Sequence, residues 1–266
     1  MKCVLVIAGS DSSGGAGVQA DIKTISNLGA HAFTVITAVT AQNSLGIRAV
    51  HRLPPGFIIQ QAQAVIEDFS PDAVKIGMIH SGDAVKEVAR LLELHPLPNV
   101  VLDPLYKATA GGELAEEGAY PLVANLLLPL VRVVTPNMSE AEELANRSVR
   151  TLEQAKEAAV IIKGMGPDVV ITGGHMEEEC VDLLYDGQEF HEFHGSRIRS
   201  RHTHGSGCVF SSALATFLSK GRNLADATGW AKAFTRQAIL DGYACGSGNG
   251  PVRPPISKGW NTDGRR

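Results

Sequence analysis

The stretch VIAGSDSSGGAGVQAD, residues 6–21, joins an apolar run to a segment of helical periodicity through a glycine-rich turn. Residues 15–20, GAGVQA, have the G-x-G-x-x-A spacing of a dinucleotide-binding turn. Such a turn also needs an acidic residue roughly 20 positions further on, to bind the ribose hydroxyls. Here no Asp or Glu lies between Asp21 and Glu67, and the second apolar run ends at Gln42 instead. The sequence therefore argues against a dinucleotide site. It leaves open that the glycines only let a strand turn tightly into a helix.

Apolar runs typical of strands alternate with segments of helical period along most of the chain. We expect strands at 3–8, 33–40, 47–53, 73–76, 100–102, 131–134, 168–171, 181–185 and 189–193. We expect helices at 17–28, 54–69, 84–94, from 138 onward, and at 152–163, 207–220 and 224–241. This alternation predicts an α/β fold with a central, mostly parallel sheet between two layers of helices. The last two strands predict a small antiparallel hairpin, which fits a (βα)8 barrel less well.

Length and composition indicate one large globular domain. The 266 residues carry a formal net charge of −4, which provides no basic field to attract nucleic acid or an anionic membrane surface. No linker or repeat divides the chain, so we expect one domain over residues 1–250. A glycine- and proline-rich tail, 251–266, is expected to be flexible.

The cysteine pattern and the apolar runs bear on the compartment. The four cysteines are widely spaced and form no C-x-x-C pair, so we expect free thiols in a reducing compartment. The first apolar run is too short for a signal peptide, and none approaches the ~20 residues of a membrane helix. We therefore expect a cytoplasmic protein that does not enter a membrane.

A second glycine-rich turn, HTHGSGCVFSSALA at residues 202–215, carries more chemistry. Gly205, Ser206 and Gly207 open an amphipathic helix, whose unpaired N–H groups and positive dipole end form an anion site. The same field is expected to lower the pKa of the Cys208 thiol and make it a base or nucleophile. The alternative is that Ser206 is an ordinary N-cap and Cys208 a small buried residue.

Polar residues follow several of the expected strands. Asp21, Gln42, Asp103 and Asn137 all come just after strands or at the helix starts that follow. Because ligands of an open parallel sheet bind at the carboxyl ends of the strands, these residues could form one site. In TPNMSEAEEL, Asn137 and Glu140 share a helix face and suit a hydrated Mg²⁺. The same N-x-x-E spacing also fits a capping box.

Together these stretches resemble the hydroxymethylpyrimidine and hydroxymethylpyrimidine-phosphate kinases of thiamine biosynthesis, in the ribokinase-like superfamily. The resemblance runs almost from end to end, with its motifs in the expected order. They are IAGSDSSGGAGVQADIKT (7–24), VITAVTAQNSLG (35–46), KIGM (75–78), VLDP (101–104), TPNMSEAEEL (135–144), GGH (173–175), THGSGC (203–208) and GNGPV (248–252).

The resemblance implies a ribokinase-like fold that transfers the γ-phosphoryl group of MgATP to a pyrimidine. The acceptor is the hydroxymethyl group of 4-amino-5-hydroxymethyl-2-methylpyrimidine, or its monophosphate. By this likeness Cys208 is the catalytic base, and the backbone of Gly205, Ser206 and Gly207 forms the anion hole. Other implied groups are Asp21, Gln42 and Met78 for the pyrimidine, Asp103, Asn137 and Glu140 for Mg²⁺, and Thr172, Thr203 and Lys232 for the nucleotide. The likeness also implies a homodimer.

The chain departs from the family pattern at two cationic positions. The usual VAKSG is KATAG here, residues 107–111, so that Thr109 replaces a lysine. The usual KGGH begins with Thr172. The missing charges weaken the case for the second phosphorylation, that of the monophosphate. A pyridoxal kinase and a non-catalytic pyrimidine or nucleotide sensor are the alternatives. Some pyridoxal kinases carry a second cysteine in the active-site flap, and residues 108–110 hold none.

Overall fold

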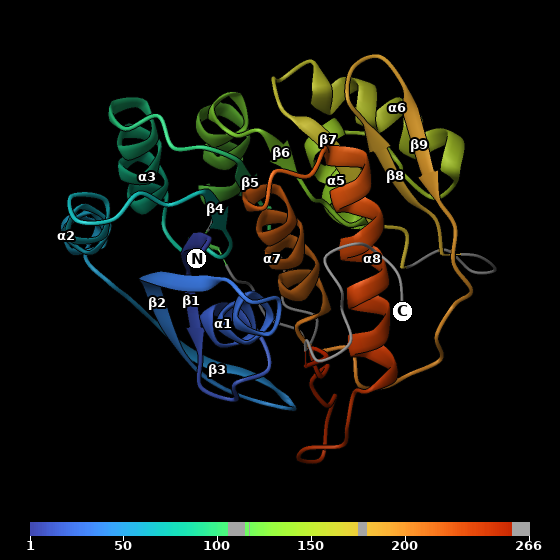
Figure 1. Ribbon diagram of the computed structural model, residues 1–266, viewed down its shortest axis with the longest axis horizontal. Coiled ribbons are helices and arrows are strands. Elements are labelled where there is room, and N and C mark those ends of the chain that lie inside the picture. The colour runs from blue at the N-terminus through green and yellow to red at the C-terminus, as the bar shows by residue number, and fades with distance from the viewer. Residues whose placement is uncertain (106–114, 117, 175–179, 257–266) are drawn as a thin grey trace.

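The structure is a computed structural model that describes residues 1–105, 115–116, 118–174 and 180–256 (Figure 1). These residues form a nine-stranded sheet of order β3-β2-β1-β4-β5-β6-β7-β8-β9. The strands are β1 (Cys3–Asp11), β2 (His31–Asn43), β3 (Gly46–Arg52), β4 (Ala73–Ile76), β5 (Val100–Leu102), β6 (Val133–Val134), β7 (Asp168–Ile171), β8 (Asp182–Tyr185) and β9 (Phe190–Phe193). The strands from β2 through β7 in this order pair in parallel. Antiparallel strands complete both edges, β3 on one side and β8–β9 on the other.

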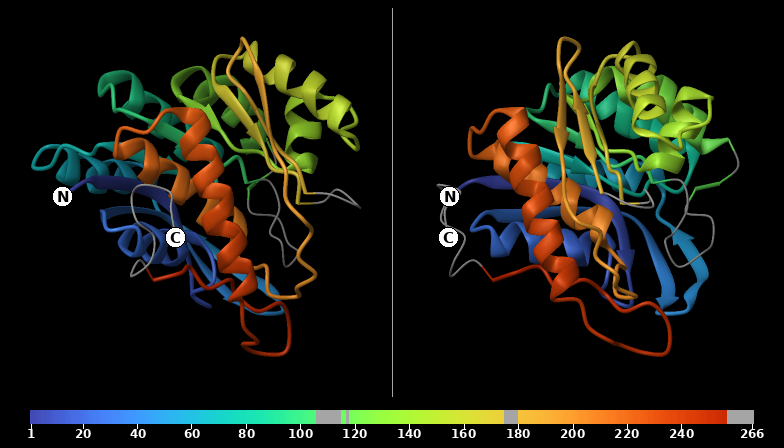
Figure 2. Two further views of the ribbon diagram at one scale, coloured as in Figure 1. Left: turned by 45° about the vertical axis from the view of Figure 1, so that its right-hand side comes forward. Right: turned by 90° about the vertical axis from the view of Figure 1, so that its right-hand side faces the viewer.

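Helices cover the two faces of the sheet in separate layers, as Figure 2 shows from the side. One layer holds α1 (Gly17–Asn27), α7 (Ser206–Ser219) and α8 (Leu224–Leu240). The other holds α2 (Pro55–Ile66), α3 (Gly82–Leu94), α4 (Ala119–Leu122), α5 (Met138–Ala145) and α6 (Leu152–Lys163), with short helical turns at Val123–Leu127 and Leu128–Leu130. The predicted α/β fold, with a mostly parallel sheet between helical layers and a small hairpin, is confirmed.

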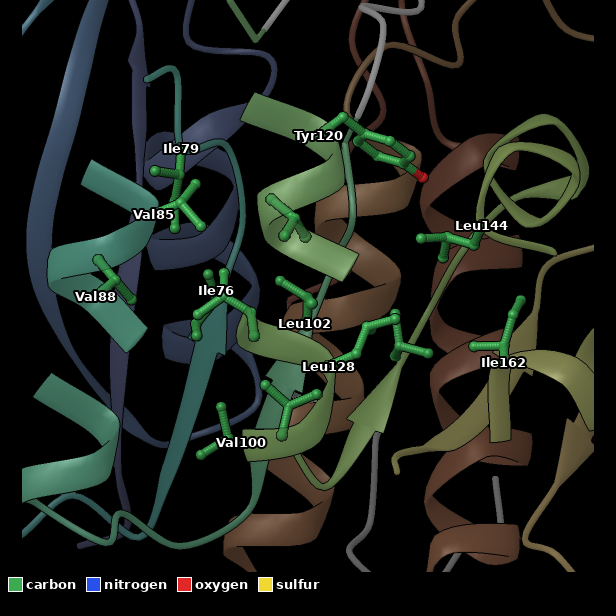
Figure 3. Packing of buried hydrophobic residues seen from close by; sticks show 14 of the residues in the cluster. Ile76, Ile79, Val85, Val88, Val100, Leu102, Tyr120, Leu128, Leu144 and Ile162 are labelled. Atoms are coloured by element: carbon green, nitrogen blue, oxygen red, sulfur yellow. The ribbon is translucent and has the colours of Figure 1, made fainter. Parts of the chain in front are cut away.

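The core follows from the alternation of side chains along the buried strands. Val4 and Val6 of β1 face α1 and α7, whereas Leu5 and Ile7 face the α2–α3 layer. Both sides of the central strands are apolar, as a sheet covered on both faces requires. Figure 3 shows part of the cluster between the sheet and the α2–α3 layer, in which Ile76 and Leu102 of the sheet lie among helical side chains.

Three features differ from the sequence-based expectation. β3 pairs antiparallel with β2, which extends the sheet at an edge where periodicity predicted only a strand. The four-residue helix α4 was missed because it is too short to show a helical period. The tail was predicted to start at 251, but Val252 is buried and its N–H donates to the His204 carbonyl at 3.1 Å. Arg253 N likewise donates to the Ala238 carbonyl, so the packed domain extends beyond residue 250. Residues 257–266 lie outside the described residues.

No helix in the ranges that the structure describes combines the length and apolar character needed to cross a bilayer.

Candidate active site

A cavity of about 640 Å³ lies at the carboxyl ends of the parallel strands. It runs from the end of β2, past the loops after β4 and β5, to the starts of α5 and α7 and the side of α8. All the site residues predicted from the sequence line it except Asp21. These lining residues are Gln42, Met78, Asp103, Asn137, Glu140, Thr172, Thr203, Gly205, Ser206, Gly207, Cys208 and Lys232. The fold thus brings together residues that are up to 190 positions apart, from Gln42 to Lys232 (232 − 42).

Asp11, which the sequence analysis did not single out, organises the first glycine-rich turn. Its carboxylate accepts hydrogen bonds from the backbone N–H groups of Ser13 at 2.8 Å and Ala16 at 2.9 Å. The His204 Nε2 lies 2.9 Å from Asp11 Oδ2, which joins this turn to the second one. Burial raises the pKa of Asp11, but the hydrogen bonds from His204, Ser13 and Ala16 outweigh it and lower the pKa to about 2.

The two glycine-rich turns pack against each other at contact distance. A Cβ on Gly15 would lie 2.3 Å from the His204 ring, and a Cβ on Gly205 would lie 1.9 Å from the Gly15 carbonyl oxygen. Gly205 also has a φ of +84°, in the left-handed region that favours glycine. The glycines of the opening stretch therefore let the two turns approach closely where both border the cavity. They are more than a tight strand-to-helix connection.

Gln42 and Met78 form one end of the cavity. Gln42 Oε1 accepts from Thr40 Oγ1 at 3.1 Å, and its Nε2 lies 3.5 Å from His204 Nε2. Met78 is buried, and a Cβ on Gly9 would lie 2.8 Å from its sulfur. This end combines a fixed amide with an apolar wall, which suits a flat ring that carries hydrogen-bonding groups.

Cys208 lies in the first turn of α7, as predicted, but its ionisation differs from the expectation. Burial raises the pKa of the Cys208 thiol to about 12, and the nearby Asp21 and Asp103 add to this shift. Lys75 and the Gly17 backbone N–H act in the opposite direction without overcoming it. The expected lowering by the helix N-terminus is therefore wrong, because desolvation costs the thiolate more than the helix end supplies.

Asp21 was expected in the same pocket as Gln42, and the structure contradicts this. The residue is completely buried beneath the cavity, where both its oxygens lie 3.0 Å from Lys75 Nζ. Ser212 Oγ donates to it at 2.7 Å. Desolvation raises the pKa of Asp21 despite these partners. Asp21 faces inward because it shares the buried side of α1 with Val18 and Ile25.

Asp103 and the Asn137–Glu140 pair border the middle of the cavity. Asp103 is buried and accepts from Ser211 Oγ at 3.1 Å, and burial raises its pKa to about 6 against the attraction of Lys75. Asn137 Oδ1 accepts from Glu140 N at 3.0 Å, and Glu140 Oε2 accepts from Asn137 N at 2.9 Å. The alternative interpretation of these two residues as a capping box of α5 is thus confirmed. Both nevertheless line the cavity.

Lys232 and Thr172 form the other end. Lys232 Nζ lies 3.2 Å from Asp182 Oδ2 and donates to the Cys180 carbonyl at 3.0 Å. The Gly173 N–H donates to the other Asp182 oxygen at 2.9 Å. Thr172 follows β7 and lies beside Asn137. Of the two positions where family lysines are absent, Thr172 is described and borders the cavity, whereas Thr109 lies outside the described residues.

The hydrogen bonds of the Asp11 carboxylate predict that the protein loses stability in acid. Its folded pKa is below the ordinary value, so its contribution is present above pH ~4 and disappears as pH falls toward 2. Asp11→Asn should therefore lower the free energy of unfolding by roughly 2 kcal/mol at pH 7 and by much less near pH 2. Urea unfolding of both proteins across this range measures the difference. An equal gap at both pH values would contradict the assignment.

Comparisons with known proteins identify the family of this chain. The model of the family described as phosphomethylpyrimidine kinase matches residues 11–253. The hydroxymethylpyrimidine/phosphomethylpyrimidine kinase of Bacillus subtilis is 42% identical over 251 residues, which cover 93% of each protein. The thiamine biosynthesis bifunctional protein ThiED of Geobacter sulfurreducens is also 42% identical over 251 residues. They make up 94% of this chain and 51% of that relative, so this chain spans about half of its length.

Solved structures show the same fold. The Bacillus subtilis pyridoxal kinase, in an ADP complex, superposes with a TM-score of 0.90 at 34% identity and covers 96% of this chain and 98% of its own. The phosphomethylpyrimidine kinase of Clostridium difficile 630 superposes with a TM-score of 0.81 at 36% identity. The match covers 90% of this chain and 100% of that one. With a family match over residues 11–253 and relatives above 40% identity along nearly all its length, the chain belongs to the phosphomethylpyrimidine kinase family.

Proposed function

We propose that the protein phosphorylates the hydroxymethyl group of 4-amino-5-hydroxymethyl-2-methylpyrimidine at the expense of ATP, as a step of thiamine biosynthesis. The observation that carries the proposal is one continuous cavity lined by Gln42, Cys208 and the N-terminus of α7. It joins a ring-binding end to an anion-binding helix start, in a chain of this kinase family.

The residues of the cavity divide the work of phosphoryl transfer. The Gln42 amide hydrogen-bonds the aminopyrimidine, and Met78 packs against its ring. The Cys208 thiolate, which is the minor form near neutral pH because burial raises the pKa of the thiol to about 12, takes the hydroxyl proton as the oxygen attacks the γ-phosphorus and ADP leaves. The N–H groups of Gly205, Ser206 and Gly207 stabilise the negative charge on the transferred group. Since little covalent chemistry falls to the protein in such a transfer, this positioning accounts for most of the catalysis.

ATP and Mg²⁺ are proposed to bind in the remaining part of the cavity. Among the neighbours, a Staphylococcus aureus pyridoxal kinase is described in complex with AMP-PCP and pyridoxal. Here Thr172, Thr203 and Lys232 are the proposed nucleotide contacts. Asp103 and Glu140 offer the oxygen donors that Mg²⁺ prefers, with Asn137 beside them. Within the described ranges, no set of three His, Cys, Asp or Glu side chains lies close enough together to hold a metal ion. Bound there, Mg²⁺ would neutralise the charge of the phosphates.

We also propose that the protein is a cytoplasmic homodimer. Support for a reducing compartment comes from the cysteines, of which all four are free thiols. The dimer rests only on the family likeness.

Release of ADP with three acceptors tests the proposed activity against its alternatives. We expect turnover of the free hydroxymethylpyrimidine and slower turnover of its monophosphate, because Thr172 provides no cation. Pyridoxal is the necessary comparison, since the pyridoxal kinase of Bacillus subtilis superposes on this chain with a TM-score of 0.90. A preference for pyridoxal would show that the protein is a pyridoxal kinase and that the pyrimidine is not its substrate. Tight binding of the pyrimidine without any ADP release would indicate a sensor.

A further inference from the structure

Asp182 is a buried carboxylate at the start of β8, at the end of the cavity that Lys232 also borders. Its side chain is 7% exposed. One carboxylate oxygen accepts from the Gly173 N–H at 2.9 Å, and the other lies 3.2 Å from Lys232 Nζ. A buried carboxylate is costly unless it is paired and hydrogen-bonded, and here each oxygen has its own donor. Asp182 thus connects the chain that follows β7 to the side of α8.

Lys232 reaches this carboxylate from α8, which packs against β8 and β9 (Figure 1). Its Nζ also donates to the Cys180 carbonyl at 3.0 Å. Two of the three ammonium hydrogens are therefore taken by Asp182 and by this carbonyl. Nζ lies 3.8 Å from the Cys180 sulfur as well, and a thiol is only a weak acceptor. The third hydrogen can therefore pass from the sulfur to an anionic oxygen in the cavity, which is a stronger acceptor.

The Gly173 backbone is the second group that Asp182 holds. A Cβ on Gly173 would lie 1.9 Å from the Val181 carbonyl oxygen, so the lack of a side chain lets these two segments meet. Directly before it, the Thr172 N–H donates to the Pro136 carbonyl at 2.9 Å. The backbone at residues 172–173 is thus fixed from both sides, and Asp182 supplies one of the two attachments.

A role in stability alone explains the place of this carboxylate poorly. A buried ion pair often stabilises a fold no more than an apolar pair of the same shape would. Lys163 and Asp168 form another such pair, at 2.8 Å and at the opposite end of β7. That pair does not line the cavity, whereas both Asp182 and Lys232 do.

We propose that Asp182 is a positioning residue, which holds the Lys232 ammonium and the Gly173 N–H in place for the phosphate oxygens of the nucleotide. This rests on the proposed function, in which Lys232 and Thr172 contact the nucleotide. The carboxylate itself would repel a phosphate, so Asp182 acts through its two donors. A lysine side chain loses much rotamer freedom when it is fixed. Because Asp182 fixes Lys232 before the nucleotide binds, that cost does not reduce the affinity for the nucleotide.

A double-mutant cycle tests whether Asp182 acts through Lys232. Calorimetric titration with ADP in the presence of Mg²⁺ gives the affinity of the native protein, Asp182→Asn, Lys232→Met and the double variant. Asparagine keeps the shape and an oxygen for the Gly173 N–H, and loses the charge that pairs with Lys232. We expect Asp182→Asn to weaken ADP binding about five- to tenfold in the native background. In the Lys232→Met background it should cause no loss, because no ammonium remains to be positioned.

The other outcomes separate positioning from charge and from loosening of the fold. The removed charge alone predicts tighter ADP binding by Asp182→Asn, since a carboxylate repels phosphate. A merely structural ion pair predicts weaker binding of both ADP and the hydroxymethylpyrimidine, whereas positioning leaves the affinity for the pyrimidine unchanged. Asp168→Asn breaks the pair with Lys163 outside the cavity and serves as the matched control, with native affinity for both ligands.

Native or tighter ADP binding by Asp182→Asn, or equal losses in the two backgrounds, would overturn the proposal. Failure of the proposed function is a separate result. It would be a native protein that binds ADP and shows the coupling between Asp182 and Lys232, but does not turn over the pyrimidine.

Discussion

Replacing Cys208 by alanine should lower kcat for the pyrimidine by about a hundredfold to ten-thousandfold, the usual contribution of a general base. The Michaelis constants of both substrates should change little, because Gln42, Met78 and the backbone of the anion hole remain in place. Cys208→Ser should be almost as inactive, since a hydroxyl of similar size is a far weaker acid and its anion is scarcer. ADP release under saturating ATP and pyrimidine measures both variants.

The other cysteines provide the control for this experiment. Cys245 is exposed and does not line the cavity, so Cys245→Ala should keep native kcat. Full activity of Cys208→Ala would show that no base is needed at this position. Because the pKa of the Cys208 thiol is about 12, we also expect native turnover to rise with pH across the neutral range, and this rise to be absent in Cys208→Ala.

Gly205→Ala should disrupt both folding and the anion site. A Cβ there would lie 1.9 Å from the Gly15 carbonyl oxygen and would sit on a backbone with φ of +84°. The strain and the clash together should lower the free energy of unfolding by about 2–5 kcal/mol. Because the two glycine turns would have to separate, the N–H groups of residues 205–207 would also shift, and kcat should fall with stability.

The other end of the same helix supplies a matched control. Gly221 follows α7 with a φ of +80°, and no atom lies within 4 Å of a Cβ placed there. Gly221→Ala should therefore cost only the backbone strain, about 1–2 kcal/mol, and leave kcat unchanged. Chemical denaturation and ADP release on both variants separate the shared strain from the contact with Gly15. Equal losses would contradict the packed-turn account.

The sequence predicted the fold, and it predicted polar residues that the structure brings to one cavity, because both follow from local signals. Nearly every strand and helix could be read from apolar periodicity, and the start of α7 from its glycines. The position of Asp21 could also have been read that way, since it lies three residues after Val18 and four before Ile25 on the apolar side of α1. Lys75, a charge inside an apolar strand of four residues, was a similar signal that was not used.

What could not be predicted depends on contacts between distant segments. The pair formed by Asp11 and His204 joins residues 193 positions apart. The sequence of neither turn indicates that it contacts the other. The pKa of Cys208 is set by burial and by three charges from other elements, of which the sequence shows only the helix start. A helix N-terminus does favour a thiolate, but the expectation for the pKa of Cys208 omitted the larger cost of desolvation.

The central claim is that the start of α7 receives the transferred phosphoryl group next to Cys208, in the cavity that binds the pyrimidine at Gln42. A crystal structure with the hydroxymethylpyrimidine, Mg²⁺ and a non-hydrolysable ATP analogue tests it most directly. The account predicts the γ-phosphate at the N–H groups of residues 205–207. It also predicts the aminopyrimidine within hydrogen-bond distance of the Gln42 amide, and the hydroxymethyl oxygen beside the Cys208 sulfur. A γ-phosphate bound away from these N–H groups, or a pyrimidine bound away from Gln42, would contradict it.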